Sequence, residues 1–172
     1  MEAGFEVEVE PQDVREAKAR GPGEVSVVVA ANAARKARAA AARHRDRVVV
    51  AADTLVYDEE RVYGKPRGPG EALEFLMGFR GRRVHVATGL AVAARGVVHC
   101  TVDAADVVFR RFTRSEAEAY VRSGEPLGKA GAFSIRGRGA MLVERVEGHP
   151  STVLGLPLHR LAETLRAMGL LD

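Results

Sequence analysis

The sequence predicts a single α/β domain over residues 1–172, with helices and strands in mixed order. The 172 residues, 47% of them apolar, suffice for one hydrophobic core and are too few for two ordinary domains. Segments with helical periodicity and β-branched runs typical of strands both occur. Because the two kinds do not alternate strictly, we do not expect a Rossmann sheet.

The N-terminal half is expected to hold an extended segment, a helix, a strand and a second helix. A turn over residues 18–24 (KARGPGE) precedes an alanine-rich helix that starts near Ser26. The β-branched run Val48–Ala52 is typical of a short strand buried on both faces. Apolar residues at helical spacing predict a helix over Pro69–Phe79, opened by Gly68.

The C-terminal half is expected to hold a long hairpin and two helices. The stretches Arg83–Ala94 and Gly96–Arg110 flank a short turn, which predicts two antiparallel strands. Residues 113–116 (TRSE) fit a capping box, in which the threonine and the glutamate each satisfy a free backbone N–H at a helix start. A last helix, Leu158–Met168, follows Pro157.

The charge distribution does not require a nucleic-acid partner. The formal net charge is only +3, although the sequence pI is about 9.3. Residues 32–47 carry six Lys or Arg against one Asp, with no aromatic side chain between them. A solvated helix face therefore fits this stretch better than a nucleic-acid surface, which remains the third-ranked hypothesis.

Cysteine content and hydropathy indicate a cytoplasmic protein without a membrane partner. The single cysteine, Cys100, excludes an intramolecular disulfide and fits a reducing compartment. The N-terminus is acidic and has no secretion signal, and no apolar run approaches the roughly 18 residues that a membrane span needs.

Asp53 is the first candidate for chemistry. It follows the predicted strand Val48–Ala52, and the carboxyl ends of strands are where open α/β sheets place ligands. The hydroxyl of Thr54 lies beside it. A turn or capping aspartate explains the position equally well, so both interpretations stay open.

Lysine usage points to further candidates. Only four of the 26 basic side chains are lysines, namely Lys18, Lys36, Lys65 and Lys129. Lys65 stands between Gly64 and Pro66, in a stiff turn suited to presenting a compact charge to a phosphate. An exposed turn lysine is the alternative. The glycine-rich stretch 128–139 could line a phosphate or base pocket, but it is neither a Walker loop nor a dinucleotide fingerprint.

These residues together suit metal-assisted work on a phosphate ester or anhydride. Four stretches then resemble, in order and spacing, the Maf family of nucleoside triphosphate pyrophosphatases. They are AADTLVYDEERVYGKP (51–66), HVATGLAV (85–92), SEAEAYVRSGEPLGKAGAFSIRG (115–137) and STVLGLPLHRLAETL (151–165).

The resemblance implies an α/β fold of the inosine-triphosphatase-like kind, with a mixed β-sheet, flanking helices and a nucleotide cleft. It also implies hydrolysis of noncanonical or pyrimidine nucleoside triphosphates to the monophosphate and pyrophosphate. A divalent cation, Mg²⁺ or Mn²⁺, would be the cofactor, and a homodimer the assembly.

Site residues follow from the same motifs. Asp53 matches the family's catalytic acid, which activates water and lies beside the metal. Lys65 matches a phosphate-contacting lysine. Lys36, expected to bind the substrate, matches the lysine of a Glu-Lys-Ala pattern, in which Arg35 stands here in place of the glutamate. Thr54 is expected to contact the substrate.

Two internal departures from the family pattern affect the site. The acidic pair that follows the first strand segment in the family reads Asp13-Val14 here, so either Asp13 or Glu16 is expected as a second metal ligand. A glutamine involved in base preference is replaced by Arg136, which offers donors only and would suit an oxygen of the base or a phosphate.

A third departure concerns the N-terminus. Family members normally begin with a strand and a Ser-x-Ser-Pro-Arg-Arg loop just before the helix that leads into EAGFEV (residues 2–7), whereas this chain starts at Met1, within the end of that helix. The expectation is a start codon assigned too late. In the family this loop supplies hydrogen-bond donors to the phosphates. Because the sequence lacks it, the alternative function is a noncatalytic nucleotide-binding regulator of cell division.

Overall fold

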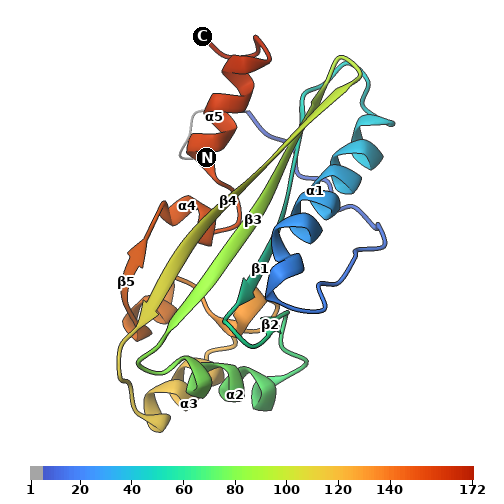
Figure 1. Ribbon diagram of the computed structural model, residues 1–172. Coiled ribbons are helices and arrows are strands. Elements are labelled where there is room, and N and C mark those ends of the chain that lie inside the picture. Colours follow the sequence, from blue (N-terminus) through green and yellow to red (C-terminus); the bar gives the residue numbers. More distant parts are fainter. Residues whose placement is uncertain (1–5) are drawn as a thin grey trace.

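The computed structural model describes residues 6–172 (Figure 1). The helix end expected at Met1 lies outside this range. The helices are α1 (Val25–Ala41), α2 (Pro69–Phe79), α3 (Arg114–Arg122), α4 (Pro150–Val153) and α5 (Leu158–Ala167). The strands are β1 (Val49–Tyr57), β2 (Val62–Tyr63), β3 (Arg83–Ala94), β4 (Val97–Phe109) and β5 (Val143–Glu147).

The strands form one sheet in the order β2-β1-β3-β4-β5. The predicted α/β class with flanking helices is confirmed. The resemblance implied a mixed sheet, and the pairings between the described strands are all antiparallel. The predicted hairpin is β3–β4, and its turn places Arg95 and Gly96 at positive φ (51° and 78°), as suits the right-handed twist of two long strands.

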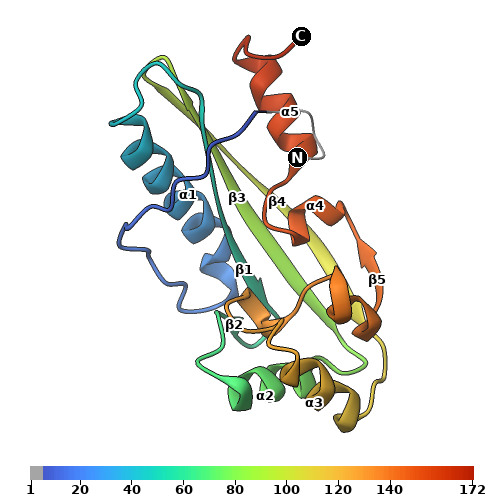
Figure 2. The same ribbon diagram turned by 180° about the vertical axis from the view of Figure 1, so that it is seen from behind.

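The central strand, β3, is covered on both faces. Its residues Ala91 and Ala93 pack against alanines of α1. The alternate residues, Leu90 and Val92, pack against leucines of α5. Successive side chains of a strand point to opposite faces, so α1 and α5 lie on opposite sides of the sheet. Seen from either side, α2 and α3 lie together at the other end of the sheet from α5 (Figure 2).

The prediction that Val48–Ala52 is a strand buried on both faces was wrong. The strand, β1, extends to Tyr57, and Val50 near its start is 40% exposed. The cause is its neighbour β2, which pairs only with Val56 and Tyr57. The rest of β1 therefore forms an edge of the described sheet, and the doubly covered strand is β3.

Helix boundaries follow the local signals closely. Thr113 and Glu116 form the predicted capping box at the start of α3. The helix α1 begins at Val25, one residue before the predicted Ser26, and α5 ends at Ala167. Within residues 6–172, no helix combines the length and the apolar character needed to cross a membrane.

Candidate functional site

A glycine on β3 lets α1 approach the sheet beside Asp53. Gly89 pairs directly with Asp53 across the β1–β3 ladder. A Cβ added to Gly89 would lie 2.3 Å from the carbonyl oxygen of Val29 in α1, far inside van der Waals contact. The helix backbone thus rests on the bare backbone of β3, and the next turns of α1 reach Asp53.

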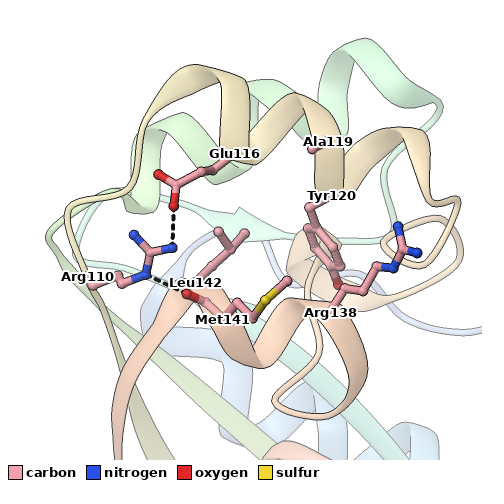
Figure 3. A pocket seen from close by; sticks show the side chains of 7 residues that line it. All are labelled: Arg110, Glu116, Ala119, Tyr120, Arg138, Met141 and Leu142. Atoms are coloured by element: carbon pink, nitrogen blue, oxygen red, sulfur yellow. Dashed lines mark hydrogen bonds and ion pairs between the residues drawn. The ribbon is translucent and has the colours of Figure 1, made fainter.

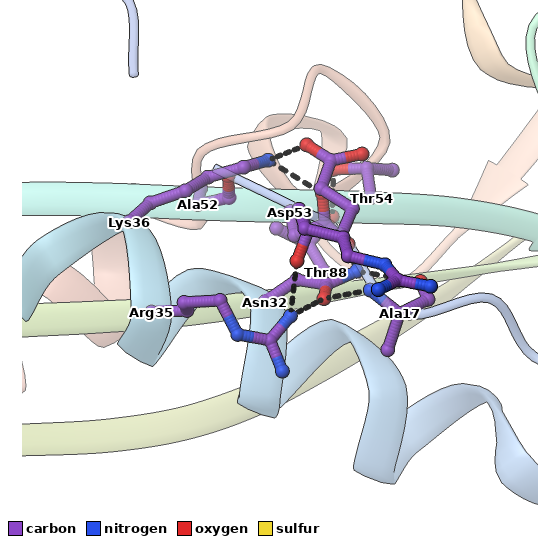
Figure 4. A network of polar contacts seen from close by, with 10 residues as sticks. Ala17, Asn32, Arg35, Lys36, Ala52, Asp53, Thr54 and Thr88 are labelled. Atoms are coloured by element: carbon purple, nitrogen blue, oxygen red, sulfur yellow. Dashed lines mark hydrogen bonds and ion pairs between the residues drawn. The ribbon is translucent and has the colours of Figure 1, made fainter. Parts of the chain in front are cut away.

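Lys36 of α1 joins two carboxylates (Figure 4). Its Nζ lies 2.7 Å from Oδ1 of Asp53 and 2.7 Å from Oε1 of Glu16. The side chains of Asp53 and Lys36 are mostly buried, 10% and 19% exposed, whereas that of Glu16 is 52% exposed. The ammonium therefore connects a strand residue with the N-terminal segment that passes over α1.

Lys36 remains a cation in this setting. Burial disfavours its charged form, but the hydrogen bonds to Asp53 and Glu16 outweigh that cost, so the pKa of Lys36 is raised above its usual value. A partly buried ammonium between two carboxylates leaves one net negative charge.

Asn32, one helical turn before Lys36, is a site residue that sequence reasoning missed. Its Nδ2 donates to Oδ2 of Asp53 at 2.9 Å, so Asp53 is held at both oxygens. The available signal was spacing, because residues four apart on a helix share one face. Asn32 stands four positions before a candidate lysine in a stretch that is otherwise small and apolar.

Thr54 faces the other side of β1 from Asp53. Its hydroxyl lies 2.8 Å from that of Thr88, with which it is paired in register. Thr88 donates in turn to the carbonyl oxygen of Thr152 in α4. This buried chain fixes the edge of β1 against the helix that covers it.

A cleft of about 820 Å³ runs along this part of β1. Its lining includes residues of both faces, among them Asp53 and Thr54, so the cleft opens at the edge of the strand. It also includes Glu16, Lys36 and Lys65. The structure thus brings five predicted site residues to one concavity, although they come from four separate parts of the chain.

Two loops bring further cations to the cleft. The backbone N–H of Gly131 donates to the carbonyl oxygen of Gly64, joining the loop of Lys65 to the loop of Lys129. Gly131 also packs on Val56, which lies about 10 Å beyond Asp53 along an extended strand. Lysines are therefore spread along β1, as suits an elongated polyanion better than a single phosphate.

Two predicted residues stand apart from the cleft. The side chains of Asp13 and Arg136 are exposed, and neither belongs to the cleft lining. Arg136 contributes through its backbone, whose N–H donates to the hydroxyl of Ser134, a lining residue. Of the two carboxylates expected as second metal ligand, the structure brings Glu16 to Asp53.

The residues present fit a hard divalent cation that takes only one or two of its ligands from the protein. Among residues 6–172, no group of three or more His, Cys, Asp or Glu side chains is arranged to hold a metal by itself. Mg²⁺, however, is commonly bound through one or two carboxylates together with water and substrate phosphates. Asp53 and Glu16 supply those oxygens.

A smaller pocket of about 200 Å³ lies between α3 and the segment before β5 (Figure 3). Two of its charged groups are paired with each other, since Arg110 bonds to Glu116 and also to the carbonyl oxygen of Met141. Burial raises the pKa of its Tyr120, so the phenol stays neutral. None of the predicted site residues lines this pocket.

The fold and the larger cleft define a class: an α/β protein in which carboxylates and lysines gather at a strand edge, suited to a phosphorylated ligand. The family model described as Maf-like protein matches residues 1–168. The chain belongs to the Maf family.

Curated relatives support this membership. A dTTP/UTP pyrophosphatase of Aquifex aeolicus is 39% identical over 168 residues, covering 98% of this chain and 87% of the relative. One of Moorella thermoacetica is 48% identical over 143 residues, covering 82% and 74%. One of Bacillus cereus strain AH820 is 37% identical over 145 residues, covering 84% and 76%.

Proposed function

We propose that the protein is a nucleoside triphosphate pyrophosphatase that acts on pyrimidine nucleotides of the dTTP and UTP kind. One observation carries the proposal: a mostly buried carboxylate, Asp53, shares one cleft with Lys36 and Lys65. The names of the relatives agree with it, since all three are called dTTP/UTP pyrophosphatases.

Asp53 is the general base in this reaction. A water oxygen bonds to the α-phosphorus, the bond from that phosphorus to the bridging oxygen of the β-phosphate breaks, and pyrophosphate leaves. Asp53 accepts the proton of the water. Lys65 and Lys129 line the cleft, where they neutralise charge on the phosphates and on the departing pyrophosphate.

Asp53 and Glu16 would hold the divalent cation, Mg²⁺ or Mn²⁺. Such an ion polarises phosphoryl oxygens and favours formation of hydroxide from water. Lys36 then serves as the fixed link between the two carboxylates, since its ammonium touches both.

With Mg²⁺ or Mn²⁺, the purified protein should release pyrophosphate from dTTP and UTP faster than from dATP or GTP. Chelation by EDTA should abolish the release, and added metal should restore it. Coupled detection of pyrophosphate measures both effects. Glu16→Gln should raise the metal concentration needed for half-maximal rate. Release that persists in EDTA would contradict the metal proposal, and absence of release from all four nucleotides would contradict the function.

Lys65→Ala should weaken nucleotide binding and turnover together, by about 10- to 100-fold in kcat/KM, because a charge-assisted bond to a phosphate is lost. Steady-state kinetics with UTP measure the effect. Arg67→Ala is the matched control, since Arg67 is an exposed cation two residues away that pairs with Glu71 outside the cleft. Equal kinetics in the two variants would make Lys65 an ordinary surface residue.

We also propose that the protein is a cytoplasmic homodimer. Support for a dimer comes from the family resemblance and from Leu154, Leu156 and Leu158, which are each more than a third exposed and of which Leu154 lines the cleft. A reducing compartment agrees with the single cysteine. Nucleotide-pool sanitation and control of septum formation would both use the same cleft.

A further inference from the structure

The carboxamide of Asn32 uses its entire hydrogen-bonding capacity. Its Oδ1 accepts from the backbone N–H of Ala17 at 2.8 Å and from Arg35 at 3.1 Å. Its Nδ2 donates to the carbonyl oxygen of Ala17 at 3.0 Å and to Asp53 at 2.9 Å. Asn32 is only 2% exposed, and a buried amide without partners would be costly. These four bonds therefore explain a polar residue on the buried face of α1.

The first consequence concerns Asp53. Lys36 binds its Oδ1 and Asn32 binds its Oδ2, and the two donors come from successive turns of one helix (Figure 4). A carboxylate held at both oxygens from a rigid element has a fixed plane. The lone pairs that remain for a water molecule then point in fixed directions, as general-base catalysis requires.

The second consequence concerns the N-terminal segment. Residues 15–19 form neither helix nor strand, so side-chain anchors determine where they lie. Asn32 binds both backbone groups of Ala17, and Arg35 binds the carbonyl oxygen of Arg15. Glu16 stands between these two anchored residues, and its carboxylate thereby reaches Lys36.

We propose that Asn32 is the positioning residue of the site, a single side chain that orients Asp53 and places Glu16 at the same time. The inference rests on the proposed function for its catalytic consequence. Its structural consequence, the anchoring of Ala17, does not depend on any activity. The two consequences can therefore be tested separately.

Two variants separate the two roles. Asn32→Leu keeps the number and branching of the side-chain heavy atoms and removes all four bonds. Asn32→Asp keeps an acceptor for the Ala17 N–H but replaces the donor to Asp53 by an oxygen. Both should lower kcat for UTP by about 10- to 100-fold, the effect of losing a hydrogen bond to a charged group, while KM changes less than roughly 3-fold. Rates are expressed per nucleotide site, counted by titration with an α,β-imido analogue of UTP, so that unfolded protein does not contribute.

Amide hydrogen exchange, followed by NMR, measures the anchoring of Ala17. Its N–H should lose protection in Asn32→Leu and keep it in Asn32→Asp. Ser151→Ala is the control, because Ser151 is also buried and hydrogen-bonded, to His149 and to the N–H of Leu158, and none of these three residues lines the cleft. It should leave kcat and the exchange of Ala17 unchanged.

Parental kcat in both Asn32 variants would overturn the proposal, as would parental exchange of Ala17 in Asn32→Leu. If Asn32→Leu does not fold, the proposal is tested by Asn32→Asp alone, and a parental kcat in that variant would overturn it. A parent protein that releases no pyrophosphate would refute the proposed function instead, and the exchange of Ala17 would then decide the role of Asn32 alone.

Discussion

Asp53→Asn should lose nearly all pyrophosphate release, by about 10²- to 10⁴-fold in kcat, because an amide cannot accept the proton of the attacking water. Nucleotide binding should survive. The substitution keeps the shape of the side chain, and Lys36 keeps its second partner, Glu16, at 2.7 Å. Release from UTP measures the first effect, and calorimetric titration with an α,β-imido analogue measures the second.

Asp46→Asn is the matched control for this substitution. Asp46 is exposed in the turn before β1 and does not line the cleft, so the same chemical change there should leave both measurements unchanged. A rate for Asp53→Asn within a few-fold of the parent would show that the base has been assigned to the wrong residue. Loss of binding and turnover together would make Asp53 a structural ion-pair partner of Lys36 instead.

Local sequence signals were sufficient for much of the fold. The capping box at Thr113 and the two-residue turn at Arg95 concern residues adjacent in the chain, so their geometry follows from the residue types. The motifs around Asp53 and Lys65 also identified residues that prove to share one cleft. In each case the information lies within a few consecutive positions.

Local sequence signals could not predict how deeply β1 and Asn32 are buried. The β-branched run at Val48 indicated a central strand, but the length of the neighbouring strand decides whether a strand is central, and β2 has only two residues. Asn32 lies in a helix whose cations suggested a solvated face. Its burial follows from the close packing of α1 on β3, where Val29 meets Gly89, 60 positions further along the chain, and only the folded structure shows that contact.

Gly89→Ala should therefore damage both the fold and the site. The added methyl group would lie 2.3 Å from the Val29 carbonyl oxygen and 2.7 Å from the Ala30 nitrogen, and both are backbone atoms that no rotamer change can move. The helix α1 must recede, at a cost of about 1–3 kcal/mol in the free energy of unfolding, which is typical of an overpacked core. Denaturation by urea measures this cost.

Gly78→Ala is the matched control: the same chemical change is expected to raise the free energy of unfolding instead of lowering it. Gly78 is exposed in α2, and an added Cβ there would meet no atom within 4 Å beyond its chain neighbours and the backbone of its own helix, so alanine should stabilise the helix by about 1 kcal/mol or less. Equal stabilities for the two variants would mean that α1 does not rest on Gly89.

The activity of folded Gly89→Ala should fall further than its stability suggests. Ordinary contact begins near 3.4 Å, so α1 has to move by roughly 1 Å, and a displacement of that size at reacting groups can cost about 100-fold in rate. Asn32 and Lys36 move with the helix, whereas Asp53 stays on β1, because two different elements carry them. A fully folded variant with the parental kcat would show that the contacts from α1 to Asp53 are dispensable, and catalysis would then depend on the strand edge and its loops alone.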